Sequence, residues 1–130
     1  MEDNINFNER IDFKYVLGEK EDVVILMLYG KIGSREIPIL EECEKELKSK
    51  SQKIIILNFH DVAVFMPAAH TFFAKFQKTF RDSGRLFGLC SLRPDIKSSL
   101  LLAGIIRESE LYSNIPDGWK ALNSKLQTEA

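Results

Sequence analysis

The feature that most constrains the fold is an apolar run that leads into a helical pattern, within KIIILNFHDVAVFMPAAHTFFAKFQKTF (53–80). The run 54–57 is rich in isoleucine, which favours a strand buried on both faces. Pro67 fits the first turn of a helix predicted over 67–82, with an aromatic stripe on one side. A loop predicted at 58–65 would lie at the carboxyl end of the strand, where open α/β sheets usually bind ligands or partners.

The N-terminal part predicts a hairpin and a first helix. Ile11, Phe13, Tyr15 and Leu17 alternate with polar residues, which is typical of a half-exposed edge strand. We expect a charged turn at 18–22, and then a central strand at 23–29 that is apolar on both faces. The helix should begin at 35–37, because Pro38 is tolerated only in a first turn. Its buried stripe is predicted to contain Leu40, Cys43 and Leu47.

The second half of the chain repeats strand and helix. The pattern predicts a strand at 86–90, a helix from Pro94 to Gly104 with Ile96, Leu100 and Ala103 buried, and a weak strand at 109–112. A last helix should turn Trp119, Leu122 and Leu126 inward. Repeated strand–helix units imply parallel pairing, and the opening hairpin makes the sheet mixed. We therefore predict an α/β sandwich with a mixed sheet of four or five strands and about four helices. Its single domain would span 11–127, with residues 1–10 as a loose arm.

Composition excludes several classes of function. The 18 basic and 19 acidic residues nearly cancel, so the charge expected of a nucleic-acid-binding protein is missing. The polar, acidic start does not resemble a signal peptide, and the longest apolar run, 23–29, is too short to cross a bilayer. Cys43 and Cys90 lie in apolar patterns, as reduced core thiols do. These features predict a cytoplasmic protein without membrane insertion.

Signatures of catalysis and cofactor binding are missing from the sequence. It contains no phosphate-binding GxxxxGK[ST] loop, no GxGxxG, no GxSxG and no CxxC. His60, Asp61 and His70 could form a metal site or an acid–base pair, but their spacing matches no usual ligand pattern and no nucleophile accompanies them. Asp61 is more simply a turn former. We expect no catalytic residue, no metal and no cofactor.

Several local strings, in this order, resemble the STAS domain of anti-sigma factor antagonists and sulphate transporters. VVILMLYGKIGS is similar to that family's apolar strand ending in Gly-x-Leu/Ile-Asp, and KIIILNFHDVAVFM to its third strand and the following loop. RDSGRLFGLCSLRPDIKSSLLLAGI is similar to its Gly-Gly-x-Leu-x-Leu strand, Ser-Pro helix start and Leu-rich helix. The resemblance covers about 11–126 and implies a STAS-like fold.

The resemblance also implies a regulatory site that this chain has altered. In anti-sigma factor antagonists the second helix opens with Asp-Ser-[Ser/Thr]-Gly, whose hydroxyl is phosphorylated by a partner kinase. Met66, Pro67, Ala68 and Ala69 align with those four positions, so Ala68 replaces the phosphoacceptor. The family's loop aspartate aligns with Gly33. Thr71 is the nearest hydroxyl, but a hydroxyl inside a helix is poorly presented for modification.

These features lead to one main hypothesis and two alternatives. The first is a non-catalytic interaction module of bacterial signalling and transcription regulation, which binds a kinase-type anti-sigma factor, another STAS protein or a second copy of itself in a homodimer. The expected partner-binding residues are Gly33, Ser34, His60, Asp61, Val64, Phe65, Met66, Ala68, His70 and Thr71. The apolar residues of this set and Val62 could instead pack under the loop. One alternative is an accessory domain of lipid or anion transport, whose phenylalanine-rich helix encloses a small molecule. The other is an enzyme that uses His60, Asp61 and His70.

Overall fold

The computed structural model describes residues 13–129 and contains one mixed five-stranded sheet with four α-helices. The strands are β1 (Lys14–Lys20), β2 (Val23–Ile32), β3 (Ile54–Phe65), β4 (Leu86–Cys90) and β5 (Leu111–Tyr112). The helices are α2 (Ile37–Ser49), α3 (His70–Asp82), α4 (Pro94–Leu102) and α5 (Ile115–Glu129), with 3₁₀ turns η1 (Ser34–Glu36), η2 (Pro67–Ala69) and η3 (Glu108–Glu110). The predicted fold class is confirmed. The expected arm at 1–10 and the position of Ile11 lie outside the described residues.

The strands lie in the order β1-β2-β3-β4-β5. Strand β1 is antiparallel to β2, and the other neighbouring pairs are parallel. The hairpin is longer than its sequence indicated, because Lys20 still pairs with Val23 and only Glu21 and Asp22 form the turn. Glu21 adopts a positive φ of 52°, which this short connection requires. The charged turn predicted at 18–22 was therefore too long.

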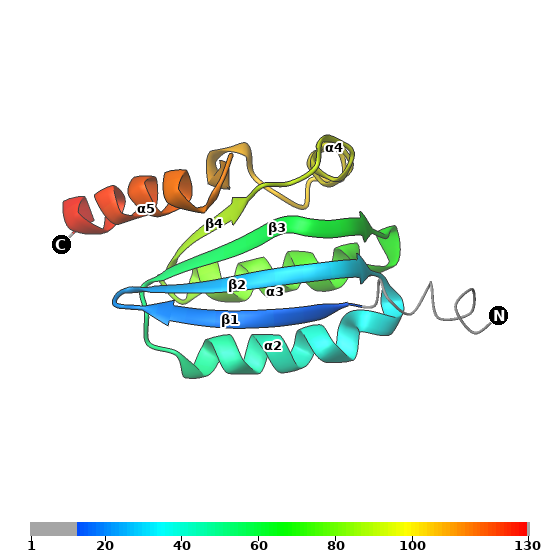
Figure 1. The fold of residues 1–130 in the computed structure, drawn as a ribbon, viewed down its shortest axis with the longest axis horizontal. Helices are drawn as coiled ribbons and strands as arrows, with labels where there is room; N and C mark the ends of the chain where they lie inside the picture. The colour runs from blue at the N-terminus through cyan, green and yellow to red at the C-terminus, as the bar shows by residue number, and fades with distance from the viewer. Residues whose placement is uncertain (1–12, 130) are drawn as a thin grey trace.

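Helices cover the two faces of the sheet unequally. Helices α2, α3 and α4 contribute to one large core, which includes Leu40, Cys43 and Leu47 as predicted. On the opposite face α5 packs over β3 and β4 in a smaller core that contains Ile54, Ile56 and Leu122. In Figure 1, α3 lies behind the strands, and no helix crosses in front of β1 and β2. Val23 and Ile25 of β2 join this smaller core, and the described helices leave the rest of this face of the hairpin uncovered.

The aromatic stripe of α3 is core, as the helical spacing indicated. Phe73, Phe76 and Phe80 are only 1–2% exposed. Phe76 packs against both other rings, with centroids 5.9 and 5.1 Å apart. Because these rings are enclosed by protein, they do not line an open pocket. Two other expectations were wrong: Ala103 is exposed beyond the end of α4, and Trp119 is 41% exposed although Leu122 is buried.

The close approach of α5 to β4 depends on Gly118. A Cβ at this position would lie 2.9 Å from Cys90 Sγ and 3.3 Å from Cδ2 of Tyr112. We expect Gly118→Ala to lower the free energy of unfolding by about 1–2 kcal/mol, because this overpacking outweighs the roughly 1 kcal/mol gained in helix propensity. Urea denaturation measures the change, with Ser124→Ala on the exposed side of α5 as the control. A Gly118→Ala variant as stable as the wild type would contradict the observed packing.

Candidate functional site

Strand β3 continues through the segment that was predicted to be a loop. The loop expected at 58–65 is wrong, because β3 runs without a break to Phe65. Its buried residues beyond Leu57 are Phe59, Val62 and Phe65, spaced by three. A half-buried strand usually has a buried residue at every second position. Because the buried residues here are spaced by three, the sequence pattern did not indicate a strand.

Two irregularities in the pairing with β2 produce that spacing. The register shifts between Met27 and Tyr29 and again between Gly30 and Lys31, so β3 has extra residues at both points. Gly30 adopts a φ of 98°, a conformation that glycine reaches without steric cost. Bulges of this kind direct neighbouring side chains to the same side of a strand. They leave two adjacent pairs exposed, His60 with Asp61 and Ala63 with Val64.

A single residue, Met66, links β3 to the turn that opens α3. Its backbone is extended, and its N–H donates to the carbonyl oxygen of Ile32 at 2.8 Å, which ties it to the end of β2. Its sulfur would lie 3.1 Å from a Cβ at Gly33, so glycine provides the space for this side chain. Gly33 in turn donates its N–H to Glu36 Oε1 at 2.7 Å and precedes Ser34 in η1. The structure thus places the buried Gly33 against Met66, and Ser34 follows Gly33 as an exposed residue.

Exposed apolar side chains gather around this connection. Val64 and Met66 are each 40% exposed, whereas Val62 and Phe65 are buried. Phe65 packs against Phe73 with ring centroids 5.2 Å apart, so it supports the surface from below and is not itself accessible. Both predicted arrangements of the apolar cluster are therefore present. We use the term docking surface for the exposed residues Ser34, Val64, Met66, Ala68 and Thr71; Gly33, which was expected among the partner-binding residues, is buried.

Ile39 is a further exposed apolar residue, and the sequence reasoning did not assign it to the site. It is 36% exposed in the first turn of α2, which begins soon after β2 ends. A signal was present, because Ile39 is an isoleucine outside the buried stripe of Leu40, Cys43 and Leu47. Helical geometry turns such a residue away from the core.

The start of α3 is accessible. Pro67 occupies the first turn, and no side chain caps either η2 or α3. Ala68 and Thr71 are exposed, whereas Ala69 is buried. Ala68 therefore presents a methyl group at the surface of the helix start. A hydroxyl or a phosphate at such a position would meet the free N–H groups of the first turn.

The three residues proposed for metal or acid–base chemistry do not form one group. His60 Nδ1 lies 3.2 Å from Asp61 Oδ1 on the exposed side of β3. The ring of His70 instead packs against Phe65, with centroids 5.8 Å apart, and its Nε2 is buried without a hydrogen-bond partner. Within residues 13–129, no three His, Cys, Asp or Glu side chains are placed to hold a metal ion. The exposed His60–Asp61 pair can offer charge and hydrogen bonds to a partner.

Both cysteines are buried and free. Burial raises the pKa of the Cys90 thiol to about 12, and burial also raises the pKa of Cys43. Since the thiolate is the reactive form, both side chains behave as small core residues.

Comparison with solved structures identifies the fold. An anti-sigma factor antagonist from Mycobacterium paratuberculosis superposes with a TM-score of 0.73 at 16% identity, covering 86% of this chain and 95% of that one. The unphosphorylated anti-sigma factor antagonist SpoIIAA gives 0.67 at 9% identity, over 88% and 97% of the two chains. A sulfate transporter family protein from Wolinella succinogenes gives 0.68 at 18% identity, over 87% and 93%. The chain therefore has the STAS fold, as the sequence resemblance implied.

Sequence comparison adds no closer relative. No family model matches the chain, and no curated protein matches it. Within the described part of the chain, no helix is both long and apolar enough to cross a membrane.

Proposed function

We propose that this chain is a non-catalytic regulatory module that binds a signalling protein through the docking surface. The observation that carries the proposal is the exposed pair Val64 and Met66 beside the uncapped start of α3. Exposed apolar side chains that lie over a packed core are typical of protein interfaces. The fold supports this function, because solved chains with the same fold include anti-sigma factor antagonists.

Regulation at this surface would differ from a phosphorylation switch. SpoIIAA is known in phosphorylated and unphosphorylated forms. The resemblance aligns Ala68 with the phosphoacceptor of such proteins, and alanine has no oxygen to receive a phosphate. Binding by this chain would then be constitutive or controlled at another site. Its partner would be a kinase-type anti-sigma factor or a second STAS protein in the bacterial cytoplasm.

Site-specific photocrosslinking in the host tests the docking surface. A benzoylphenylalanine at position 66 should crosslink to one discrete protein. The matched control places the same group at Leu102, which is 89% exposed on a different element, α4. Crosslinks to the same protein from both positions, or from position 102 alone, would refute the proposed surface.

Phosphate mapping tests the loss of the switch separately. After incubation with ATP and a soluble extract of the host, we expect mass spectrometry to find no phosphate within residues 66–71. Ala68 cannot accept one, and Thr71 lies in the first turn of α3, where its backbone is held in the helix. An Ala68→Ser variant provides the control for kinase activity in the extract. Phosphate on Thr71 of the wild type would overturn this part of the proposal.

A further inference from the structure

A cleft lies between α3 and the segment that follows α4. Its volume is about 370 Å³, within the range of about 300–1,000 Å³ that is usual for small-molecule sites. One wall contains Ala74, Lys78 and Arg81, whose spacing of four and three places them on one face of α3. Residues of the segment 104–107 form the other wall. No residue of the docking surface lines this cleft, so the two are separate features of the molecule.

Hydrogen bonds join the two walls. Gln77 is fully buried on α3 and donates to the carbonyl oxygen of Ile105 at 2.9 Å. Arg81 donates to Glu110 of η3, the element that follows the segment 104–107. Gly104 has a positive φ of 71°, which lets the chain turn back toward α3 at the end of α4. The shape of the cleft is therefore set by the packing of the fold.

Arg81 contributes a guanidinium group that is only partly used by the protein. Its side chain is 17% exposed, and the hydrogen bonds to Glu110 and Gln77 come from Nε and Nη2. In the described part of the chain no acceptor is bonded to Nη1, and Nη1 is not among the buried polar atoms that lack a partner. A guanidinium carries five N–H donors, so the two donors of Nη1 remain for a ligand.

Two further basic side chains line the same cleft. Arg107 is exposed, and no carboxylate of residues 13–129 forms an ion pair with it. Lys78 is paired with Asp82 at 2.8 Å, and both side chains are largely exposed. Three basic groups therefore line the cleft with a single carboxylate, that of Asp82. Such a lining favours an anionic ligand.

We propose that this cleft binds the phosphate group of a small molecule. A phosphate has enough oxygens to accept hydrogen bonds from three separate basic groups at once, whereas a carboxylate has two oxygens to share among them. Arg81 supplies a largely buried donor whose position is fixed by Glu110, and Arg107 supplies a positive charge that the protein leaves uncompensated. This inference rests on the cleft and not on the proposed function.

An NMR titration of the full chain tests the proposal. Inorganic phosphate, added at constant ionic strength, should shift the amide signals of Gly104, Ile105 and Arg107 and the Nε–H signal of Arg81. The shifts should saturate with a dissociation constant of about 1 mM or below. Acetate is the carboxylate comparison and should bind at least about fivefold more weakly, since it makes fewer charge-assisted hydrogen bonds. Glycerol 3-phosphate is titrated in the same way, and the tighter of the two phosphates identifies the source as an ester or as free phosphate.

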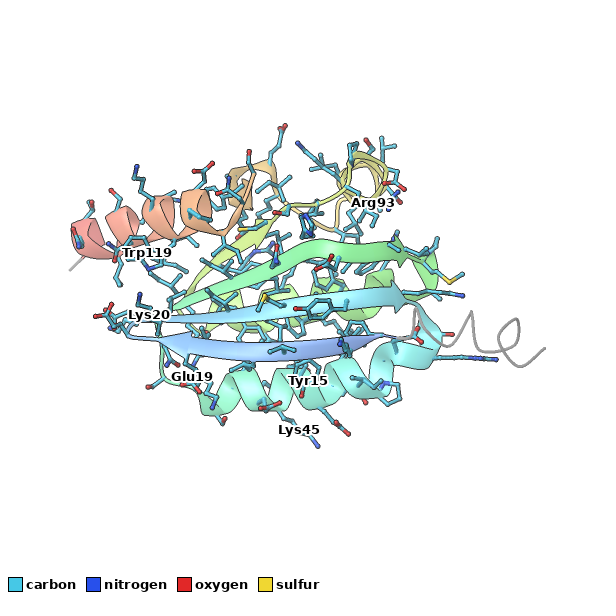
Figure 2. The ribbon with its side chains drawn as sticks, viewed as in Figure 1. Tyr15, Glu19, Lys20, Lys45, Arg93 and Trp119 are labelled. Carbon is cyan, nitrogen blue, oxygen red and sulfur yellow. The ribbon has the colours of Figure 1, made fainter. Side chains whose placement is uncertain are left out.

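Substitutions of charged residues locate the binding. Arg107→Gln should weaken phosphate binding at least about fivefold, because it removes the one basic lining residue that has no carboxylate partner. Asp82→Asn should strengthen it about twofold, since the one carboxylate of the lining is then neutral. Arg93→Gln is the matched control. Figure 2 shows Arg93 at α4, and it does not line the cleft, so this variant should bind as tightly as the wild type.

Three results would overturn the proposal. The first is a set of shifts that rise without saturation or that chloride produces equally at the same concentration. The second is equal affinity of the wild type and Arg107→Gln for phosphate. The third is an affinity for acetate as high as that for either phosphate.

Discussion

Replacing Phe73 with alanine should lower the free energy of unfolding by about 3–5 kcal/mol, the usual loss when a large core aromatic is truncated. Phe73 is 2% exposed and contacts Phe59 and Phe65 from β3, with ring centroids 5.7 and 5.2 Å away. It therefore joins α3 to the irregular half of β3 that supports the docking surface. Equilibrium denaturation in urea measures the loss.

The neighbouring phenylalanine provides the matched control. Phe72 lies on the same helix but is only partly buried, so Phe72→Ala should reduce the unfolding free energy by about 1–2 kcal/mol. Equal losses for the two variants would contradict the assignment of Phe73 to the core between α3 and β3.

Replacing Arg81 with leucine should lower the unfolding free energy by about 2–4 kcal/mol, because it leaves a largely buried carboxylate without its partner. Arg81 donates to both oxygens of Glu110, at 2.9 and 2.6 Å. Its Nη2 also donates to Gln77 Oε1 at 3.1 Å. Gln77 is fully buried and donates to the carbonyl oxygen of Ile105 at 2.9 Å. The network holds α3 against the segment between α4 and β5.

A double variant separates the loss of the ion pair from the cost of an orphaned charge. Arg81→Leu combined with Glu110→Leu should recover a large part of the stability, since no unpaired carboxylate then remains. The exposed pair Lys78 and Asp82, whose side chains are 73% and 62% exposed, serves as the surface comparison. Lys78→Ala should change the free energy by less than about 1 kcal/mol. A double variant less stable than Arg81→Leu would contradict this interpretation.

The parts of the fold that follow one regular period were predictable from the sequence. Leu40, Cys43 and Leu47 repeat at helical spacing, as do Phe73, Phe76 and Phe80, and both stripes are buried. The residues of β3 beyond Leu57 follow neither a period of two nor a helical period, because bulges opposite β2 set their directions. Such bulges depend on pairing with a distant strand, and a local pattern does not contain that information.

The position of the β3–α3 connection was predicted from the sequence, but its conformation was not. Pro67 marked the helix start, since its ring fits a first helical turn. Whether Phe65 or Met66 would be exposed depended on the direction of β3 as it ends, and both are large apolar residues. The exposure of Trp119 likewise could not be foreseen, because α5 covers only part of its sheet face.

The central claim is that a partner protein binds at the docking surface. Its most direct test begins with the protein that crosslinking identifies, purified in its free form. This partner is titrated with the wild-type chain, with Met66→Asp and with Leu102→Asp. We predict that Met66→Asp weakens binding at least about tenfold, because a charge in an apolar contact must be desolvated without a partner. Leu102→Asp should bind as tightly as the wild type, since Leu102 is an exposed residue of α4 that is not part of the docking surface. Equal affinity of the wild type and Met66→Asp for the partner would contradict the claim.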